Sequence, residues 1–308
     1  MTRRTEDVDA AARCLADGGV VAFPTETVYG LGAAAHRNEA VRRVFAIKGR
    51  PVDHPLIVHL AAAGEMAAWA AEVPTSAAAL VGSLWPGPLT VLVRRARHVP
   101  DVVTGGRDTV GLRVPAHPMA LALLAAVGDG VAAPSANRFG RVSPTTADHV
   151  LADLGDDVDL VLDGGPCALG LESTIVDCTG EPPMLLRPGG VPVEQLDELL
   201  GFAVRRTDVG PSRAPGMLAA HYAPSCAVVL GSDRASAAER VEAERALGRR
   251  AAVLDHGGDL GAFAADLYAA LRRADAAHMD VLVVVQPPDR GLGAAINDRL
   301  HRAASGSD

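Results

Sequence analysis

The spacing of apolar and polar residues predicts alternating strands and helices up to about residue 204. Residues 6–17 carry apolar side chains at helical spacing, and Val20–Phe23 is a short apolar run that ends at Pro24. The expected strands are 20–23, 56–60, 89–94, 110–114, 131–133, 160–162, 174–177 and 184–186. The expected helices are 6–17, 38–47, 64–84, 117–127, 143–154 and 193–200, with Asn38 and Ser143 as N-caps. Such alternation is typical of an α/β fold.

A second, smaller unit is expected at the C-terminal end. Residues 205–225 lack apolar periodicity and are rich in Pro, Gly, Arg and Ser, so we expect a linker there. Beyond it, apolar strands at 227–230, 251–254 and 281–285 alternate with helices at 234–247, 259–274 and 292–303. This pattern favours a parallel, Rossmann-like sheet. The expected domains are therefore 1–204 and 226–308, joined by 205–225.

Composition and charge narrow the class of protein. The formal net charge is −8 and no long basic run occurs. Because phosphate neutralisation dominates nucleic-acid affinity, this balance disfavours strong direct binding to a polynucleotide, although it leaves room for a local basic cleft. No apolar run approaches the roughly 18 residues of a membrane span. The N-terminus has no apolar signal region and the four cysteines are scattered, so we expect a cytoplasmic protein with free thiols.

One residue is singled out by composition. Lys48 is the only lysine, so 28 of the 29 Lys and Arg residues are arginines. Abundant Ala, Gly and Arg indicate a GC-rich gene, in which a lysine survives where arginine cannot replace it. The competing interpretation is that this lysine remains by chance. The residues around Lys48 are needed to distinguish the two interpretations.

Four short segments are dense in polar groups and follow or flank expected strands, where open α/β sheets bind ligands. They are Pro24–Tyr29, Lys48–Arg50, Ala133–Asn137 and Gly170–Thr174. Arg187 follows one strand after the last of them. On an extended loop, Lys48 and Arg50 would point the same way and suit a polyphosphate, and Ser135 and Asn137 have the same spacing.

Each segment alone also has a structural interpretation: a strand with a turn, a solvated charge pair, a plain turn or a β-hairpin. The familiar nucleotide motifs do not occur. There is no GxxxxGK[ST] sequence, and Gly30-Leu-Gly32 lacks the third glycine of a dinucleotide fingerprint. Any ATP site is therefore expected to be unconventional.

Together, the series PTETVYGLG, KGRPVDHPLIVH, WPGPLT, GLRVP, APSAN and GLESTIVD resembles the threonylcarbamoyl-AMP synthase family, also called YrdC-like, over residues 6–200. The APGM and HYAP sequences at 215–224 and the trailing unit resemble the longer two-domain members. The resemblance implies a twisted open mixed sheet with flanking helices. It also implies synthesis of L-threonylcarbamoyl-AMP and pyrophosphate from L-threonine, bicarbonate and ATP.

The resemblance also assigns residues to roles. The catalytic group around the nucleotide phosphates would be Lys48, Arg50, Ser135 and Asn137. L-Threonine would be bound by Thr27, His59, Arg113, Ala133 and Ser173, with Arg113 on its carboxylate. Further ATP contacts would come from His54, Thr109, Ser143, Arg187 and Tyr222, where His54 replaces an Asn of many relatives.

The implied chemistry depends on positioning rather than on a protein nucleophile. Mg²⁺ would enter with ATP, without protein ligands, and no organic cofactor is expected. The product would pass to a separate tRNA-modifying transferase complex. The 205–225 segment, with His221 and Tyr222, would be a lid over the site, and a spacer or docking strip is the alternative. Two rival functions are a carbamoyl-adenylating carbamoyltransferase and an RNA-binding module.

Overall fold

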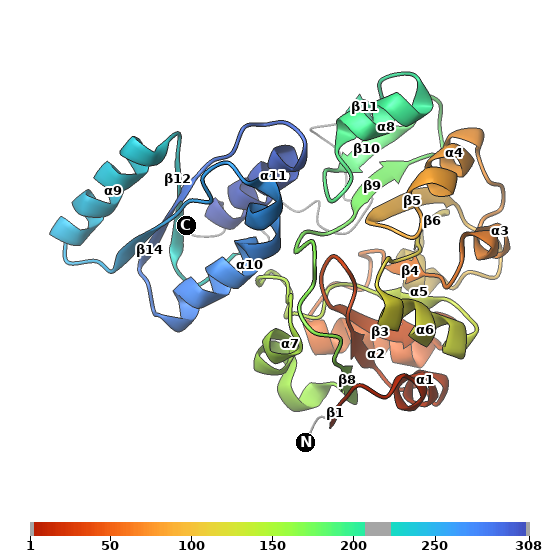
Figure 1. The fold of residues 1–308 in the computed structure, drawn as a ribbon. Helices are drawn as coiled ribbons and strands as arrows, with labels where there is room; N and C mark the ends of the chain where they lie inside the picture. Colours follow the sequence, from red (N-terminus) through yellow and green to blue (C-terminus); the bar gives the residue numbers. More distant parts are fainter. Residues whose placement is uncertain (1–2, 207–222, 306–308) are drawn as a thin grey trace.

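The computed structural model describes residues 3–206 and 223–305, which contain two separate β-sheets (Figure 1). The larger sheet has eleven strands among the described residues, in the order β1-β8-β2-β3-β7-β4-β6-β5-β9-β10-β11. Their bounds are β1 Arg3–Thr5, β2 Val21–Phe23, β3 Gly30–Ala34, β4 Ile57–His59, β5 Leu89–Arg94, β6 Thr109–Arg113, β7 Val131–Ala133, β8 Leu160–Leu162, β9 Thr174–Asp177, β10 Met184–Arg187 and β11 Arg205–Arg206. Parallel and antiparallel pairs both occur, so the expected mixed sheet is confirmed.

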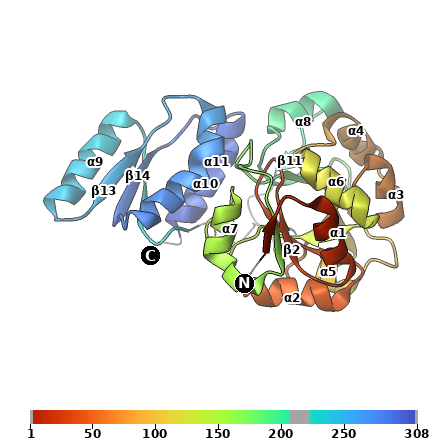
Figure 2. The same ribbon diagram turned by 60° about the horizontal axis from the view of Figure 1, so that its bottom comes forward.

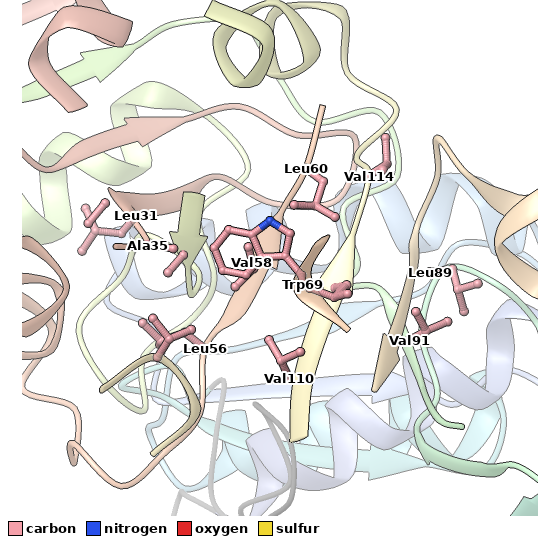
Figure 3. Packing of buried hydrophobic residues seen from close by; sticks show 14 of the residues in the cluster. Leu31, Ala35, Leu56, Val58, Leu60, Trp69, Leu89, Val91, Val110 and Val114 are labelled. Carbon is pink, nitrogen blue, oxygen red and sulfur yellow. The ribbon is translucent and has the colours of Figure 1, made fainter. Parts of the chain in front are cut away.

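Helices cover both faces of the large sheet. Their bounds are α1 Val8–Ala16, α2 Asn38–Lys48, α3 Met66–Trp69, α4 Thr75–Leu84, α5 Asp101–Thr104, α6 Pro118–Val127, α7 Ala147–Leu154 and α8 Val193–Leu200. Alternate residues of each strand face opposite sides. Val58 of β4, for example, lies in the main core with Trp69 of α3 (Figure 3). Helices α1 and α6 pack on the other face, against Val21 and Phe23 of β2 (Figure 2).

That second face becomes polar further along the sheet. Ile57 and His59 of β4 pair with Gly111 and Arg113 of β6, and paired residues share a face. A small apolar cluster of Ile57, Leu92, Ile175 and Leu186 lies on it. This stretch of sheet surface forms the floor of the candidate site.

The smaller sheet is built from β12 Ala227–Gly231, β13 Ala251–Leu254 and β14 Val281–Val285, in the order β12-β14-β13. Both pairs are parallel, as predicted. Its last strand is central, whereas a dinucleotide-binding half of the Rossmann type has its second strand there. Helix α9 (Arg234–Ala246) covers one face, and α10 (Leu260–Ala276) and α11 (Leu292–Ala304) cover the other. Figures 1 and 2 show α10 and α11 between this small sheet and the part of the chain that forms the large sheet. We call the residues around the large sheet the first domain and those around the small sheet the second domain.

Several local expectations were wrong. The helix expected from Ser143 begins at Ala147, and Thr146 caps it by accepting from the His149 amide (3.2 Å). The expected cap Asn38 is instead the first helical residue of α2. The capping position is taken by Arg37, whose side chain makes no capping hydrogen bond.

Other elements, β1, β3, α5 and β11, were not predicted. Strand β3 was not predicted, because its sequence GLGAA carries no β-branched residue. Arg205–Arg206, inside the predicted linker, pair with β10 as the outermost strand. Residues 207–222 of the proposed lid, which include His221 and Tyr222, lie outside the described residues. Among the residues that the structure describes, no helix is both long and apolar enough to cross a bilayer.

Candidate functional site

The candidate site is a pocket on the polar part of the sheet face, and it gathers side chains from segments that are far apart in sequence. Its lining residues are Thr25, Thr27, Val28, Gly30, Arg50, Ile57, His59, Arg113, Ala133, Pro134, Ser135, Glu172, Ser173 and Arg187. Eight of the residues predicted for the site are among them: Thr27, Arg50, His59, Arg113, Ala133, Ser135, Ser173 and Arg187.

The turn between β2 and β3 supplies two hydroxyls. The Thr25 hydroxyl donates to the carbonyl of Val28 (2.7 Å) and also lies 2.7 Å from the Thr27 hydroxyl. Since a hydroxyl has one proton, Thr27 must be the donor to Thr25. The remaining capacity of the Thr27 oxygen is then to accept a hydrogen bond from a ligand. Thr25 was not assigned a role from the sequence.

The loop after β7 is fixed against this turn by backbone bonds. The Leu31 amide donates to the carbonyl of Pro134 and the Ala136 amide donates to that of Tyr29, both at 2.8 Å. Close packing here requires Gly32, because a Cβ at that position would lie 2.8 Å from the Phe23 ring and 2.8 Å from Val131. The hairpin and the loop therefore form one rigid rim of the pocket.

Lys48 lies beneath this rim and does not line the pocket. It ends α2, and Gly49 caps the helix in the left-handed region (φ 65°), so the expectation of an extended Lys-x-Arg segment was wrong. Lys48 Nζ donates to the carbonyls of Ser135 and Asn137 and lies 3.4 Å from Oδ1 of Asn137. Lys48 is 3% exposed, and burial, then the charge of Arg50, hold its pKa well below the usual lysine value.

Arg50 diverges from Lys48 and reaches the pocket. It donates to the Pro55 carbonyl (3.2 Å), and its guanidinium carbon lies 5.9 Å from the centre of the Phe139 ring. Such stacking restrains the planar group without using its donors. Arg50 is buried, so its charge acts in a medium that screens poorly.

Arg113 and His59 lie side by side on paired strands. Arg113 Nε donates to the Gly87 carbonyl (3.3 Å), and its Nη2 lies 2.7 Å from Oε1 of Glu26. Burial and then the charge of Arg113 lower the pKa of His59 to about 3, so its ring is neutral at physiological pH. Glu26 was not predicted as a site residue, although its place in the PTETVY segment, between two threonines, was a usable signal.

The opposite wall comes from β9 and β10. Arg187 donates twice to the Ser173 carbonyl (3.1 and 2.8 Å) and once to its hydroxyl (3.1 Å). The Ser173 hydroxyl also lies 2.8 Å from that of Thr90. Ser173 is thus held in place from two sides. Glu172, which sequence reasoning did not assign, lines the pocket beside it.

Five predicted residues within the described part of the chain do not line the pocket. Lys48 and Asn137 lie behind its rim, and the Ser143 hydroxyl donates to Glu172 (2.8 Å). His54 lies next to Phe139, with ring centres 5.8 Å apart. Thr109 shares a face of β6 with Arg113 but lines a separate hollow beside Arg107. Tyr222 is among the residues that are not described.

The pocket suits an anionic ligand. Among the described residues, three guanidinium groups line it, whereas the one lining carboxylate, Glu172, is already bonded to Ser143 and to two residues of the second domain. No group of three or more His, Cys, Asp or Glu side chains that could hold a metal ion is found in 3–206 or 223–305. The arrangement can bind and orient anions, and the residues that line it include no Cys.

Comparison with known families and proteins shows which family the chain belongs to. A family model described as "Telomere recombination" (Sua5, YciO and YrdC) matches residues 13–189, and one described as "Threonylcarbamoyl-AMP synthase, C-terminal domain" matches 191–305. A threonylcarbamoyl-AMP synthase of Pyrococcus abyssi is 40% identical over 96% of this chain and 93% of its own. The chain belongs to the threonylcarbamoyl-AMP synthase family. Both family models are matched, so it is of the two-domain type that the sequence motifs indicated.

Other members extend the comparison. A threonylcarbamoyl-AMP synthase of Bacillus subtilis is 39% identical over 96% of this chain and 92% of its own length. The crystal structure of P. abyssi Sua5 complexed with L-threonine superposes with a TM-score of 0.93 at 38% identity, over 100% of this chain and 98% of that one. The fold is therefore shared along the whole length, including both domains.

Proposed function

We propose that this protein is an L-threonylcarbamoyladenylate synthase, which converts L-threonine, bicarbonate and ATP into L-threonylcarbamoyl-AMP and pyrophosphate. The observation that carries the proposal is the full-length structural match to a relative whose crystal structure holds L-threonine. The cation-lined pocket supports it, because both threonine and ATP bring anionic groups.

The threonine half of the pocket would lie around Arg113. Its guanidinium, oriented by Gly87 and Glu26, would bind the amino-acid carboxylate. Thr27, with its free acceptor capacity, would accept from the threonine hydroxyl or amine. The other contacts in this half would be made by His59, Ala133 and Ser173.

The nucleotide half would use Arg50 and Arg187 to neutralise phosphate charge and Ser135 to orient the phosphates. Lys48 and Asn137 would contribute mainly by holding the 135–137 loop, as Lys48 bonds to two of its carbonyls. His54, Thr109, Ser143 and Tyr222 remain proposed ATP contacts. Mg²⁺ would be held by the ATP phosphates and water, which fits its reluctance to dehydrate.

The chemistry needs no covalent intermediate on the protein. The threonine ammonium group and bicarbonate give N-carboxy-threonine, with loss of water and a proton. A carboxylate oxygen of this carbamate then attacks the α-phosphorus of ATP, and the bond from that phosphorus to the bridging oxygen breaks to release pyrophosphate. The residues bind, orient and neutralise charge, which for aligned reactants contributes on the order of 7–11 kcal/mol.

We place the reaction in the cytoplasm, where ATP is abundant, and the four cysteines are free. The product would be taken up by a separate transferase complex that modifies tRNA. This protein itself would bind small anions rather than RNA, in keeping with its net charge of −8.

Pyrophosphate release, measured with each of the twenty amino acids and with or without bicarbonate, tests the proposal. Release should require both L-threonine and bicarbonate, and mass spectrometry should detect threonylcarbamoyl-AMP. Release that needs carbamoyl phosphate instead would identify a carbamoyl-adenylating enzyme. Arg50→Gln should abolish most activity, whereas Arg43→Gln, the same change on exposed α2 surface, should not.

A further inference from the structure

Glu172 connects the pocket wall to the second domain. It is 6% exposed and immediately precedes Ser173. Its Oε2 accepts from the Tyr268 hydroxyl (2.7 Å) and from Arg299 Nε (2.8 Å), while its Oε1 accepts from Ser143 (2.8 Å). Tyr268 belongs to α10 and Arg299 to α11, so both donors come from the second domain.

Arg299 reaches both ends of the hairpin that forms this wall. Besides bonding Glu172 ahead of β9, its Nη2 donates to the carbonyl of Pro188, directly after β10 (3.0 Å). Arg299 is 1% exposed, and its Nη1 also pairs with Asp298. One buried guanidinium therefore fixes the chain on either side of Ser173 and Arg187, the two pocket residues that this hairpin supplies.

The electrostatics of the contact favour a fixed geometry. Although burial by itself would raise it, the charges of Arg299 and then Arg187 lower the pKa of Glu172 to about 2. A buried carboxylate that has lost a partner is costly, because nothing replaces the missing donor. Glu172 is thus charged at neutral pH and tied to its present position.

Apolar packing surrounds this polar contact. Leu171 and Val28, which adjoin Glu172 and Thr27, share a buried cluster with Phe263 and Leu267 of α10. Gly170 is in the left-handed region (φ 73°), and a Cβ there would lie 2.5 Å from the Ala264 carbonyl oxygen. The second domain therefore lies directly against two of the segments that line the pocket.

We infer that Tyr268 and Arg299 are positioning residues for the substrate pocket, which act through Glu172 to set Ser173 and Arg187. The second domain then supports the active-site wall from outside the pocket, through its contact with Glu172. This inference rests on the proposed function, since it takes Ser173 and Arg187 as contacts for threonine and nucleotide.

Calorimetric titration with L-threonine and ATP, together with KM values from pyrophosphate release, tests the inference in the full-length protein. Tyr268→Phe removes one hydrogen bond and keeps the ring, so Kd and KM for both substrates should rise about threefold to tenfold. Arg299→Lys keeps the charge but cannot reach Glu172 and Pro188 together, so the rise should exceed tenfold. If Arg299→Lys does not fold, Tyr268→Phe decides the question.

Glu244→Gln is the matched control. Glu244 is a buried carboxylate on the outer helix α9 and accepts from Arg240 and Arg249 (2.7 and 2.8 Å). Its loss should lower Tm without changing Kd or KM. If Tyr268→Phe and Arg299→Lys both keep the wild-type Kd and KM, the contact only holds the two domains together and the inference is wrong. An equal change of Kd and KM in Glu244→Gln would also overturn the inference. Failure of the wild-type protein to bind threonine would instead count against the proposed function.

Discussion

His59 should make the first domain sensitive to mild acid. Its ring is 4% exposed and packs edge-on to Phe23, with ring centres 5.7 Å apart. Burial, then Arg113, lower its pKa from an ordinary 6.5 to about 3. The unfolded chain therefore takes up a proton below pH 6.5, whereas the folded protein does not. The stability that follows is fully present above pH 6.5 and is lost as the pH falls toward 3.

The size of the effect follows from these two pKa values. At pH 5, protonation of an ordinary histidine in the unfolded chain lowers the free energy of unfolding by about 2 kcal/mol relative to pH 7.5. This figure hardly depends on the folded pKa as long as that value is well below 5. A His59→Gln variant has no such proton to take up, so its loss of stability between the two pH values should be smaller by about 2 kcal/mol.

Guanidinium unfolding at pH 7.5, 6.5, 5.5 and 5.0, followed by tryptophan fluorescence, measures this difference. The two tryptophans, Trp69 and Trp85, are buried in the core of the first domain and so report on the domain that holds His59. His278→Asn, at an exposed position in the second domain, is the control and should follow the wild type. If His59→Gln loses stability with pH as steeply as the wild type, the argument for a neutral buried ring is refuted.

Three substitutions test the rim and the threonine half of the pocket. Lys48→Arg keeps the charge but places a wider group under the 135–137 loop, so pyrophosphate release should fall at least about tenfold, and near-normal turnover would contradict this role. Arg113→Lys leaves a cation for Glu26 but removes the planar fork, so KM for threonine should rise far more than KM for ATP; equal changes would be inconsistent with a carboxylate contact. Gly32→Ala should lower Tm because its Cβ meets Phe23 at 2.8 Å, whereas Gly64→Ala, with nothing within 4 Å, should not.

The sequence predicted most of the strands and helices, because apolar spacing reflects which face of an element is buried. It failed where tertiary contacts replace local signals. Ser143-Pro144 has the composition of a helix start, yet the Ser143 hydroxyl is used by Glu172, which is distant in sequence. β3 has little strand propensity and forms because Gly32 lets it approach Phe23.

The candidate site was predictable in composition but not in geometry. Motifs at strand ends identified most of the lining residues, since strand ends meet along the same edge of a sheet. The spacing of Lys48 and Arg50 suggested that their side chains point the same way. In the structure, Gly49 between them is in the left-handed region, and the two side chains diverge. Nothing near Glu172 in the sequence indicated a partner at Arg299, because a pair that far apart is joined only by the docking of two domains.

The burial of Lys48 also determines how the protein responds to amine-reactive reagents. Acylating reagents attack neutral, accessible amines, and Lys48, the single lysine of the sequence, is 3% exposed. Amine-directed cross-linkers and dyes should therefore leave the Lys48 side chain unmodified while the protein is folded. Any label on Lys48 would report that the loop carrying Ser135 and Asn137 had lifted, so the single lysine is a built-in probe for opening of the rim.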